Sequence, residues 1–195
     1  MSARFSITAA RAAADRLPVV FQEADAENLP FADASFDVVL STFGVMFTPN
    51  QEQAAKELIR VCRPGGKIGL ANWTPDSFIG NLFKTIGKYV PPAPGVMSPA
   101  LWGKKAHLDN LFGSKAVVEA QSRHFVLRYK SPEHWLEIFR TYYGPVLKAF
   151  AAIDPSAREA LKADLNDLIG KFNIAADGTL VIPSEYLEVV ITTKN

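Results

Sequence analysis

Three short apolar runs, separated by turns and one helical pattern, constrain this chain most. They are Val19–Ala24, Phe36–Phe43 and Lys67–Trp73. A polar loop separates the first two runs, and a segment with helical spacing separates the last two. The order predicted is strand, loop, strand, helix, turn, strand. This is half of an open α/β sheet, in which ligands bind beyond the carboxyl ends of the strands.

The segment from Gln51 to Val61 predicts the connecting helix. Its apolar residues recur every three or four positions, and its charged residues lie mostly elsewhere. Pro64-Gly65-Gly66 ends this helix, because glycine tolerates positive φ and proline cannot extend a helix. Cys62 falls on the apolar face and is interpreted as a packed small side chain rather than a nucleophile.

Three motifs in this stretch carry a resemblance to a known family. They are Asp25-Ala26-Glu27, Phe36-Asp37-Val38-Val39 and Arg63-Pro64-Gly65-Gly66-Lys67. In this order, over residues 8–74, the chain resembles class I S-adenosylmethionine-dependent methyltransferases (methyltransferase type 11), in particular the ubiquinone and menaquinone biosynthesis enzymes. The resemblance implies a Rossmann-like sheet and methyl transfer to a small, apolar or aromatic acceptor.

The same resemblance implies the residues of the site. Asp25 would meet the adenine of the cofactor, and residues 41–43 would lie beside its sulfonium. The cofactor-binding set is Asp25, Ala26, Glu27, Ser41, Thr42 and Phe43, and the substrate-binding set is Met46, Phe47, Trp73, Trp102, His134 and Tyr142. No catalytic residue is assigned, because the methyl donor is already activated and the protein mainly positions the reacting groups.

Several of these residues also have a structural interpretation. Asp25 can serve only to turn the chain, and Trp73 can cover the edge of the sheet. Met46 and Phe47 are apolar residues of a type that is usually part of the core. The aromatic stripe that contains Tyr142 also has the helical spacing typical of a core face.

The sequence departs from the family before Val19. The family's first strand, Gly-rich turn and second strand should precede this point, yet the first glycine of the chain is Gly44. A Gly-rich turn lets backbone N–H groups approach a ligand closely. We therefore expect a truncated gene product or fragment with weak or absent S-adenosylmethionine binding. The alternative is a non-catalytic methyltransferase remnant that acts as an interaction module.

Absence of the first two strands would leave Val19–Ala24 without its usual neighbour. Exposed strand edges carry unpaired backbone groups that invite association. Three outcomes follow: this strand packs directly against residues 36–43, another chain supplies the missing strands, or the piece is unstable alone. The exposed strand edge also predicts a homodimer formed through it.

The fold class expected is α/β: an incomplete Rossmann-like sheet with an inserted helical lid and a final antiparallel edge strand. We expect a single domain with a partial cofactor-binding half (1–75), a lid (76–115) and a substrate-side half (116–195). Further expected elements are helices over 8–17, 78–89, 132–143 and 155–172, a strand or bent pair of strands over 116–130 and a final strand over 186–193. The proline density of residues 91–99 favours a lid rather than one long helix.

Composition limits the classes of partner. The 195 residues are 48% hydrophobic with a formal net charge of +1, so the chain has no basic footprint for nucleic acid. The one cysteine excludes an internal disulfide, and the three scattered histidines do not have metal-ligand spacing. The longest apolar run, 38–47, is shorter than the roughly 20 residues of a membrane span. We expect a cytoplasmic protein that binds a small-molecule substrate, with no nucleic acid, membrane or metal partner.

Overall fold

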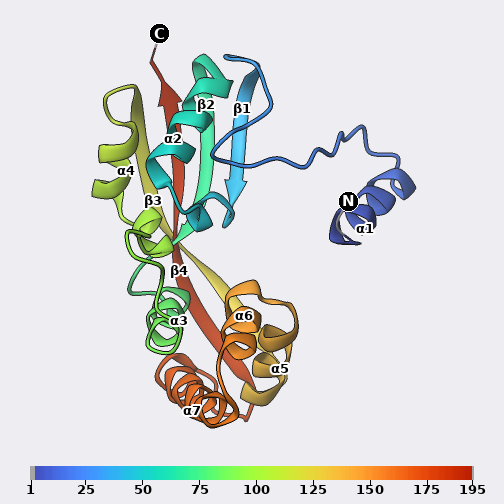
Figure 1. Cartoon of the computed structure of the whole chain (residues 1–195), viewed down its shortest axis with the longest axis vertical. Helices are drawn as coiled ribbons and strands as arrows, with labels where there is room; N and C mark the ends of the chain where they lie inside the picture. The colour runs from blue at the N-terminus through green and yellow to red at the C-terminus, as the bar shows by residue number, and fades with distance from the viewer. Residues whose placement is uncertain (1–2, 195) are drawn as a thin grey trace.

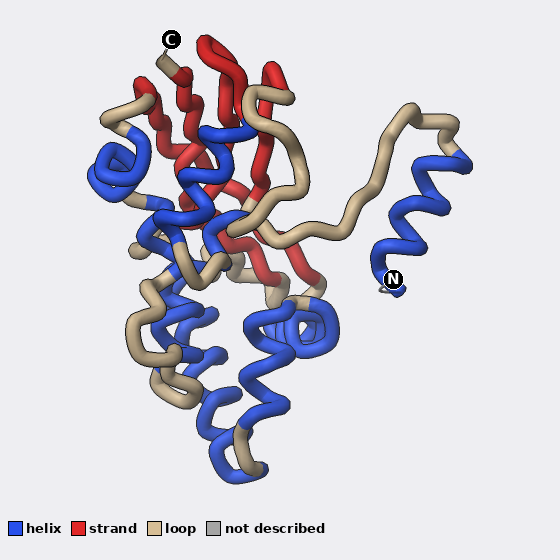
Figure 2. The backbone as a smooth tube through the Cα atoms, turned by 45° about the horizontal axis from the view of Figure 1, so that its top comes forward, coloured by secondary structure: helices blue, strands red, loops and turns tan. Residues whose placement is uncertain are grey.

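The computed structural model describes residues 3–194, which form a four-stranded sheet with helices beside and below it (Figures 1 and 2). The strands are β1 (Phe36–Thr42), β2 (Cys62–Trp73), β3 (Ala116–Tyr129) and β4 (Leu180–Thr193). The α-helices are α1 (Ala3–Ala14), α2 (Gln51–Val61), α3 (Phe78–Gly87), α4 (Lys105–Phe112), α5 (Pro132–Tyr142), α6 (Gly144–Ala152) and α7 (Pro155–Phe172). Two 3₁₀ helices, η1 (Val45–Phe47) and η2 (Pro99–Gly103), complete the chain.

The sheet has the strand order β1-β2-β4-β3. β1 and β2 are parallel, whereas β4 is antiparallel to both β2 and β3. This confirms the α/β fold and the antiparallel final strand. The expected position of that strand was wrong, because β4 lies inside the sheet and β3 forms the edge. The buried side chains of Leu187, Val189 and Ile191 alternate with more exposed ones, which suits a central strand with one covered face.

The first predicted strand does not form. Residues 19–24 are extended but are assigned to no strand, and they lead from α1 to the body of the molecule (Figure 1). The helix before them begins at Ala3 and ends at Ala14, earlier than the predicted range of 8–17. A strand needs a neighbour for its backbone groups. Within the described residues, 19–24 do not pair with β1, so the predicted direct pairing does not occur there.

One hydrophobic core runs through both halves of the molecule. α2 and α4 pack on the upper part of the sheet, and α3, α5, α6 and α7 gather below the carboxyl ends of β1 and β2 (Figure 1). The long strands β3 and β4 stay paired from Ala116↔Thr193 to Tyr129↔Leu180 and so connect the two halves. The largest fully buried side chains include Trp102, Trp135, Phe78 and Phe112. Among residues 3–194, no helix combines the length and apolarity that crossing a bilayer requires.

Candidate functional site

The carboxyl ends of β1 and β2 lie side by side, as the sequence predicts for parallel strands. Ser41 pairs with Leu70 and Thr42 with Ala71, and the Phe43 N–H donates to the Ala71 carbonyl over 2.9 Å. Both ends point toward the helical half of the molecule (Figure 1). Residues 41–43 and Trp73 are therefore brought to the edge where α/β sheets bind ligands.

An apolar groove of about 470 Å³ runs along β1, between this strand and the preceding loop. We call it the edge groove. Its volume lies within the range of small-molecule pockets, roughly 300–1,000 Å³. The residues that line it are Ala26, Leu29, Phe31, Phe36, Val38, Val39, Leu40, Ser41, Gly44, Val45, Leu58 and Val61. Of the expected cofactor residues, Ala26 and Ser41 belong to it, and the apolar side chains of Leu29 and Phe31 form its loop wall.

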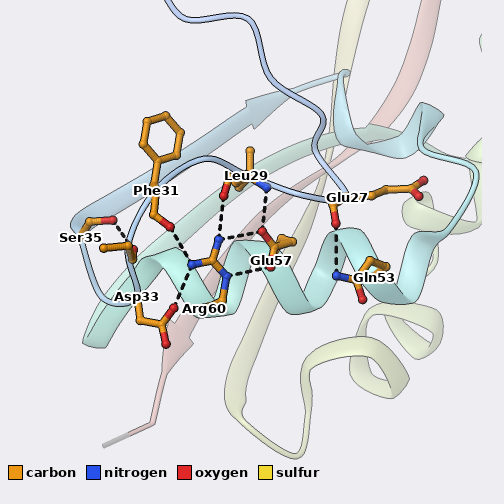
Figure 3. A network of polar contacts seen from close by, with 9 residues as sticks. Glu27, Leu29, Phe31, Asp33, Ser35, Gln53, Glu57 and Arg60 are labelled. Carbon is orange, nitrogen blue, oxygen red and sulfur yellow. Dashed lines mark hydrogen bonds and ion pairs between the residues drawn. The ribbon is translucent and has the colours of Figure 1, made fainter.

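The loop wall is held against α2 by Arg60, as Figure 3 shows. The Arg60 guanidinium donates to the carbonyls of Leu29 and Phe31, at 2.9 and 2.7 Å, and to the Asp33 carboxylate at 2.8 Å. It also makes two bonds to Glu57, at 2.7 and 2.8 Å. We call this set the Arg60 clamp. It fixes the far wall of the edge groove, and no motif in the sequence signals it.

The buried carboxylate of Glu57 completes the clamp. Its Oε2 accepts a 2.7 Å hydrogen bond from the Leu29 N–H. The hydrogen bond from Arg60 lowers the pKa of Glu57, with a further contribution from Leu29, against the opposing effect of burial. Hydrogen bonding to Glu57 and Asp33 in turn raises the pKa of Arg60. The clamp is therefore an ion pair at neutral pH.

Glu27 bonds to the start of α2, whereas Asp25 has a local contact. The Glu27 carboxylate accepts the Asn50 N–H at 2.7 Å, and its carbonyl accepts from the Gln53 side chain at 3.1 Å (Figure 3). Asp25 Oδ1 accepts the Glu27 N–H at 2.9 Å. Glu27 thus attaches the loop to the start of α2, while Asp25 turns the chain and presents an exposed carboxylate.

Aromatic rings occupy the carboxyl end next to the groove. Phe43 stacks on Trp73 with ring centroids 4.1 Å apart, and Tyr186 meets both rings edge-on. Phe43 has a φ of 53°, a conformation that is rare for a bulky residue. Backbone strain of this kind concentrates at functional sites. Thr42, the last residue of β1, is exposed.

A second apolar groove, of about 430 Å³, opens beside Phe47. We call it the Phe47 groove. Its lining residues are Phe47, Phe83, Lys84, Ile86, Gly87, Val90, Pro92, Val96, Met97, Ser98, Pro99 and Pro145. Five of them, from Pro92 to Pro99, belong to the proline-rich segment predicted as a lid.

Buried Gln51 holds the proline-rich segment in place. Its Nε2 donates to the Ser98 carbonyl at 3.1 Å, and its Oε1 lies 2.8 Å from His107 Nε2. The amide oxygen is an acceptor, so the imidazole donates through Nε2. Burial lowers the pKa of His107. The sequence contains no signal for this link, because Ser98 and His107 lie 47 and 56 residues after Gln51.

Five of the six expected substrate residues lie outside the lining of both grooves, and Trp73 among them stacks on Phe43. Met46 and Trp102 are fully buried in the core. The His134 ring lies at the start of α5 against Tyr129, and Tyr142 is exposed at the end of the same helix. The described part of the chain contains no cluster of three metal-ligating side chains.

The parallel β1–α2–β2 unit, with antiparallel β4 between β2 and β3, is the Rossmann-like arrangement of methyltransferases of solved structure. Residues 2–70 match the family described as "Methyltransferase domain". Over these residues the chain is similar to a methyltransferase domain, and its fold is that of methyltransferases of solved structure.

Three proteins illustrate what the chain is similar to. An uncharacterised protein of Mycobacterium tuberculosis, Rv1403c, is 40% identical over 184 residues, which are 91% of this chain and 65% of that protein. The demethylmenaquinone methyltransferase of Deinococcus radiodurans is 35% identical over 89 residues, 45% of this chain and 37% of the relative. A putative methyltransferase of Bacillus halodurans has a similar structure, with a TM-score of 0.64 at 17% identity, over 100% of this chain and 81% of the other. That likeness concerns the fold.

The chain spans 58% to 65% of the length of its Mycobacterium relatives.

Proposed function

We propose that the chain takes part in methyl transfer from S-adenosylmethionine to a small apolar or aromatic acceptor. The observation that carries the proposal is the edge groove, which ends at Ser41 and Gly44 on the carboxyl side of β1, within a chain that matches a methyltransferase domain. S-adenosylmethionine would supply an activated methyl group, so the chain needs to bind and orient rather than to activate.

The groove has the chemistry of the adenosine half of such a cofactor. Leu29 and Phe31 offer an apolar wall for a flat base, and exposed Asp25 offers a carboxylate to a ribose or amine. Ala26, Thr42 and Phe43 complete the set that would contact it, while Glu27 would act by fixing the loop. The described residues before Gly44 contain no glycine, so we assign no group to the methionine half.

We assign the acceptor to the Phe47 groove. This groove is mainly apolar, and residues of α3 and of the proline-rich segment line it. An apolar wall excludes water from the reacting groups, which favours a displacement that needs no charged catalyst. The name of the Deinococcus relative, a demethylmenaquinone methyltransferase, agrees with an apolar aromatic acceptor.

A titration of the chain with S-adenosylhomocysteine tests the cofactor site. We expect saturable binding, and we expect Ala26→Trp to weaken it at least about tenfold, a loss of about 1.4 kcal/mol, because the indole would fill the end of the groove. Ala151→Trp is the matched control, since Ala151 is exposed on α6. Absence of binding by the folded chain would refute the proposal, and equal affinity in the two variants would move the site elsewhere.

A further inference from the structure

The Phe47 groove carries a single charge. Among the described residues that line it, Lys84 is the charged one, and the others are apolar or, like Ser98, small and neutral. No carboxylate of the described chain belongs to this lining. Ligand pockets typically combine apolar walls with a few polar or charged groups that fix the orientation of the ligand. Lys84 is therefore the residue of this groove that can select a ligand by its charge.

Lys84 lies in the last turn of α3, beside the aromatic wall of the groove. The residue before it, Phe83, meets Phe47 edge-on, with ring centroids 5.6 Å apart. Residues three positions apart share one face of a helix. Gly87, three positions after Lys84, also lines the groove. The groove thus combines two aromatic rings with one cation.

The ion pair that Lys84 makes is long and exposed. Its Nζ lies 3.3 Å from Asp76 Oδ1, and the two side chains are 57% and 96% exposed. Exposed pairs of this kind contribute little to stability, so an anion in the groove can replace Asp76. Lys88, at the end of the same helix, is directed elsewhere: its Nζ bonds to Asp164 of α7 at 3.0 Å.

Gly87 leaves space beside the Lys84 cation. A Cβ atom at this position would meet no atom within 4 Å. Gly87 is also absent from the glycines with positive φ, so a larger residue there is not strained. The floor of the groove next to Lys84 is therefore open to a flat ring, and a side chain at position 87 would fill it.

We propose that the Phe47 groove binds an aromatic acid, with its apolar body against Phe47 and Phe83 and its anionic group paired with Lys84. This inference rests on the proposed function, because it names the chemical class of the acceptor that we assign to this groove. The apolar lining favours the ring system. The cation favours an acid over a neutral compound of the same shape. Lys84 is a specificity-determining residue in this arrangement and acts through binding alone.

Two fluorescent dyes with the same ring system test the preference for an acid. Anilinonaphthalene sulfonate is an anion, and anilinonaphthalene is its neutral parent. We expect Lys84→Met to weaken binding of the sulfonate at least about fivefold and to change that of the neutral dye less than about twofold, because methionine keeps the apolar stem and removes the charge. Lys88→Met is the matched control. It removes an equal charge from the end of α3, outside the groove lining, and should leave both affinities within about twofold.

A second substitution shows whether the dyes lie in the Phe47 groove. Gly87→Leu should weaken binding of both dyes at least about tenfold, because the new side chain would fill the space beside Lys84. Gly170→Leu is the control, since Gly170 lies on the exposed side of α7 and a Cβ there also meets nothing within 4 Å. Leucine is a better helix former than glycine, so both variants should keep the circular dichroism spectrum of the parent.

The pattern of results separates this inference from the proposed function. If Gly87→Leu weakens both dyes but Lys84→Met weakens neither, or weakens both equally, the preference for an acid is refuted and the groove remains an apolar acceptor site. Dyes that do not bind, or that bind Gly87→Leu as well as the parent, would refute the acceptor assignment and this inference together. Titration with S-adenosylhomocysteine tests the cofactor site separately from both.

Discussion

Replacing Gly103 with alanine should lower the melting temperature by about 6–12 °C, corresponding to about 3 kcal/mol. A Cβ atom at Gly103 would lie 2.1 Å from the Trp73 carbonyl oxygen and 2.6 Å from Thr74 Cα. Both are backbone atoms at the end of β2, so no side-chain rotation relieves the overlap. Thermal unfolding followed by circular dichroism measures the effect.

Gly170→Ala is the matched control for this substitution. Gly170 lies on the exposed side of α7, and a Cβ there would meet nothing within 4 Å. Alanine is the better helix former, so this variant should gain about 0.5–1 kcal/mol. A Gly103→Ala chain that melts within about 2 °C of the parent would contradict the close contact between η2 and β2.

The same contact bears on the candidate site. Gly80 of α3 approaches the other side of this turn, with its Cβ position 2.2 Å from the Thr74 carbonyl oxygen. The two glycines thus fix the backbone after Trp73, whose ring stacks on Phe43. A shift of this backbone should move the aromatic end of the site as well as lower stability. Near-ultraviolet circular dichroism of the aromatic groups reports that movement.

Elements with local periodicity could be predicted from the sequence. Their signals, apolar spacing or helix caps, lie within a short stretch of sequence. This holds for the two parallel strands, the helix between them, and the helices that begin at Pro132 and Pro155. Ser41 and Ala26 line one groove, but the strand from which the sequence placed Ala26 at that edge does not form.

Features that depend on distant partners could not be predicted. Residues 19–24 have strand composition, yet a strand forms only where a neighbour offers backbone groups. Arg60 reaches carbonyls 29 and 31 residues away, and such contacts leave no pattern in a single sequence. The burial of Met46 and Trp102 could not be predicted either. The sequence does not distinguish an aromatic or thioether side chain in the core from one that lines a pocket.

The second large effect is expected at the Arg60 clamp. Glu57→Gln should destabilise the chain by about 2 kcal/mol at pH 7. The amide keeps the size of the carboxylate, but its NH₂ group faces the donors of Arg60 and Leu29, which now lack an anionic acceptor. Urea denaturation measures the free energy of unfolding. Glu52→Gln, on the exposed side of the same helix, removes an equal charge and should cost less than about 0.5 kcal/mol.

The pH dependence distinguishes the ion pair from simple packing. Arg60 lowers the pKa of Glu57 in the folded chain, so the ionised Glu57 side chain is stabilised more in the folded state than in the unfolded state. The resulting stability is fully present above the unfolded pKa, about 4.3, and is lost as the pH falls through the lower folded value. The difference between parent and Glu57→Gln should therefore shrink as the pH falls below about 4.3, because the carboxyl of the unfolded parent is then becoming protonated.

Amide hydrogen exchange places this effect in the molecule. In Glu57→Gln the Leu29 N–H loses its carboxylate acceptor, so exchange should accelerate in residues 27–35 ahead of the rest of the chain. If the clamp also sets the width of the edge groove, S-adenosylhomocysteine binding should weaken in Glu57→Gln and remain unchanged in Glu52→Gln. Uniform acceleration across the whole chain would mean instead that Glu57 supports global stability without holding the loop.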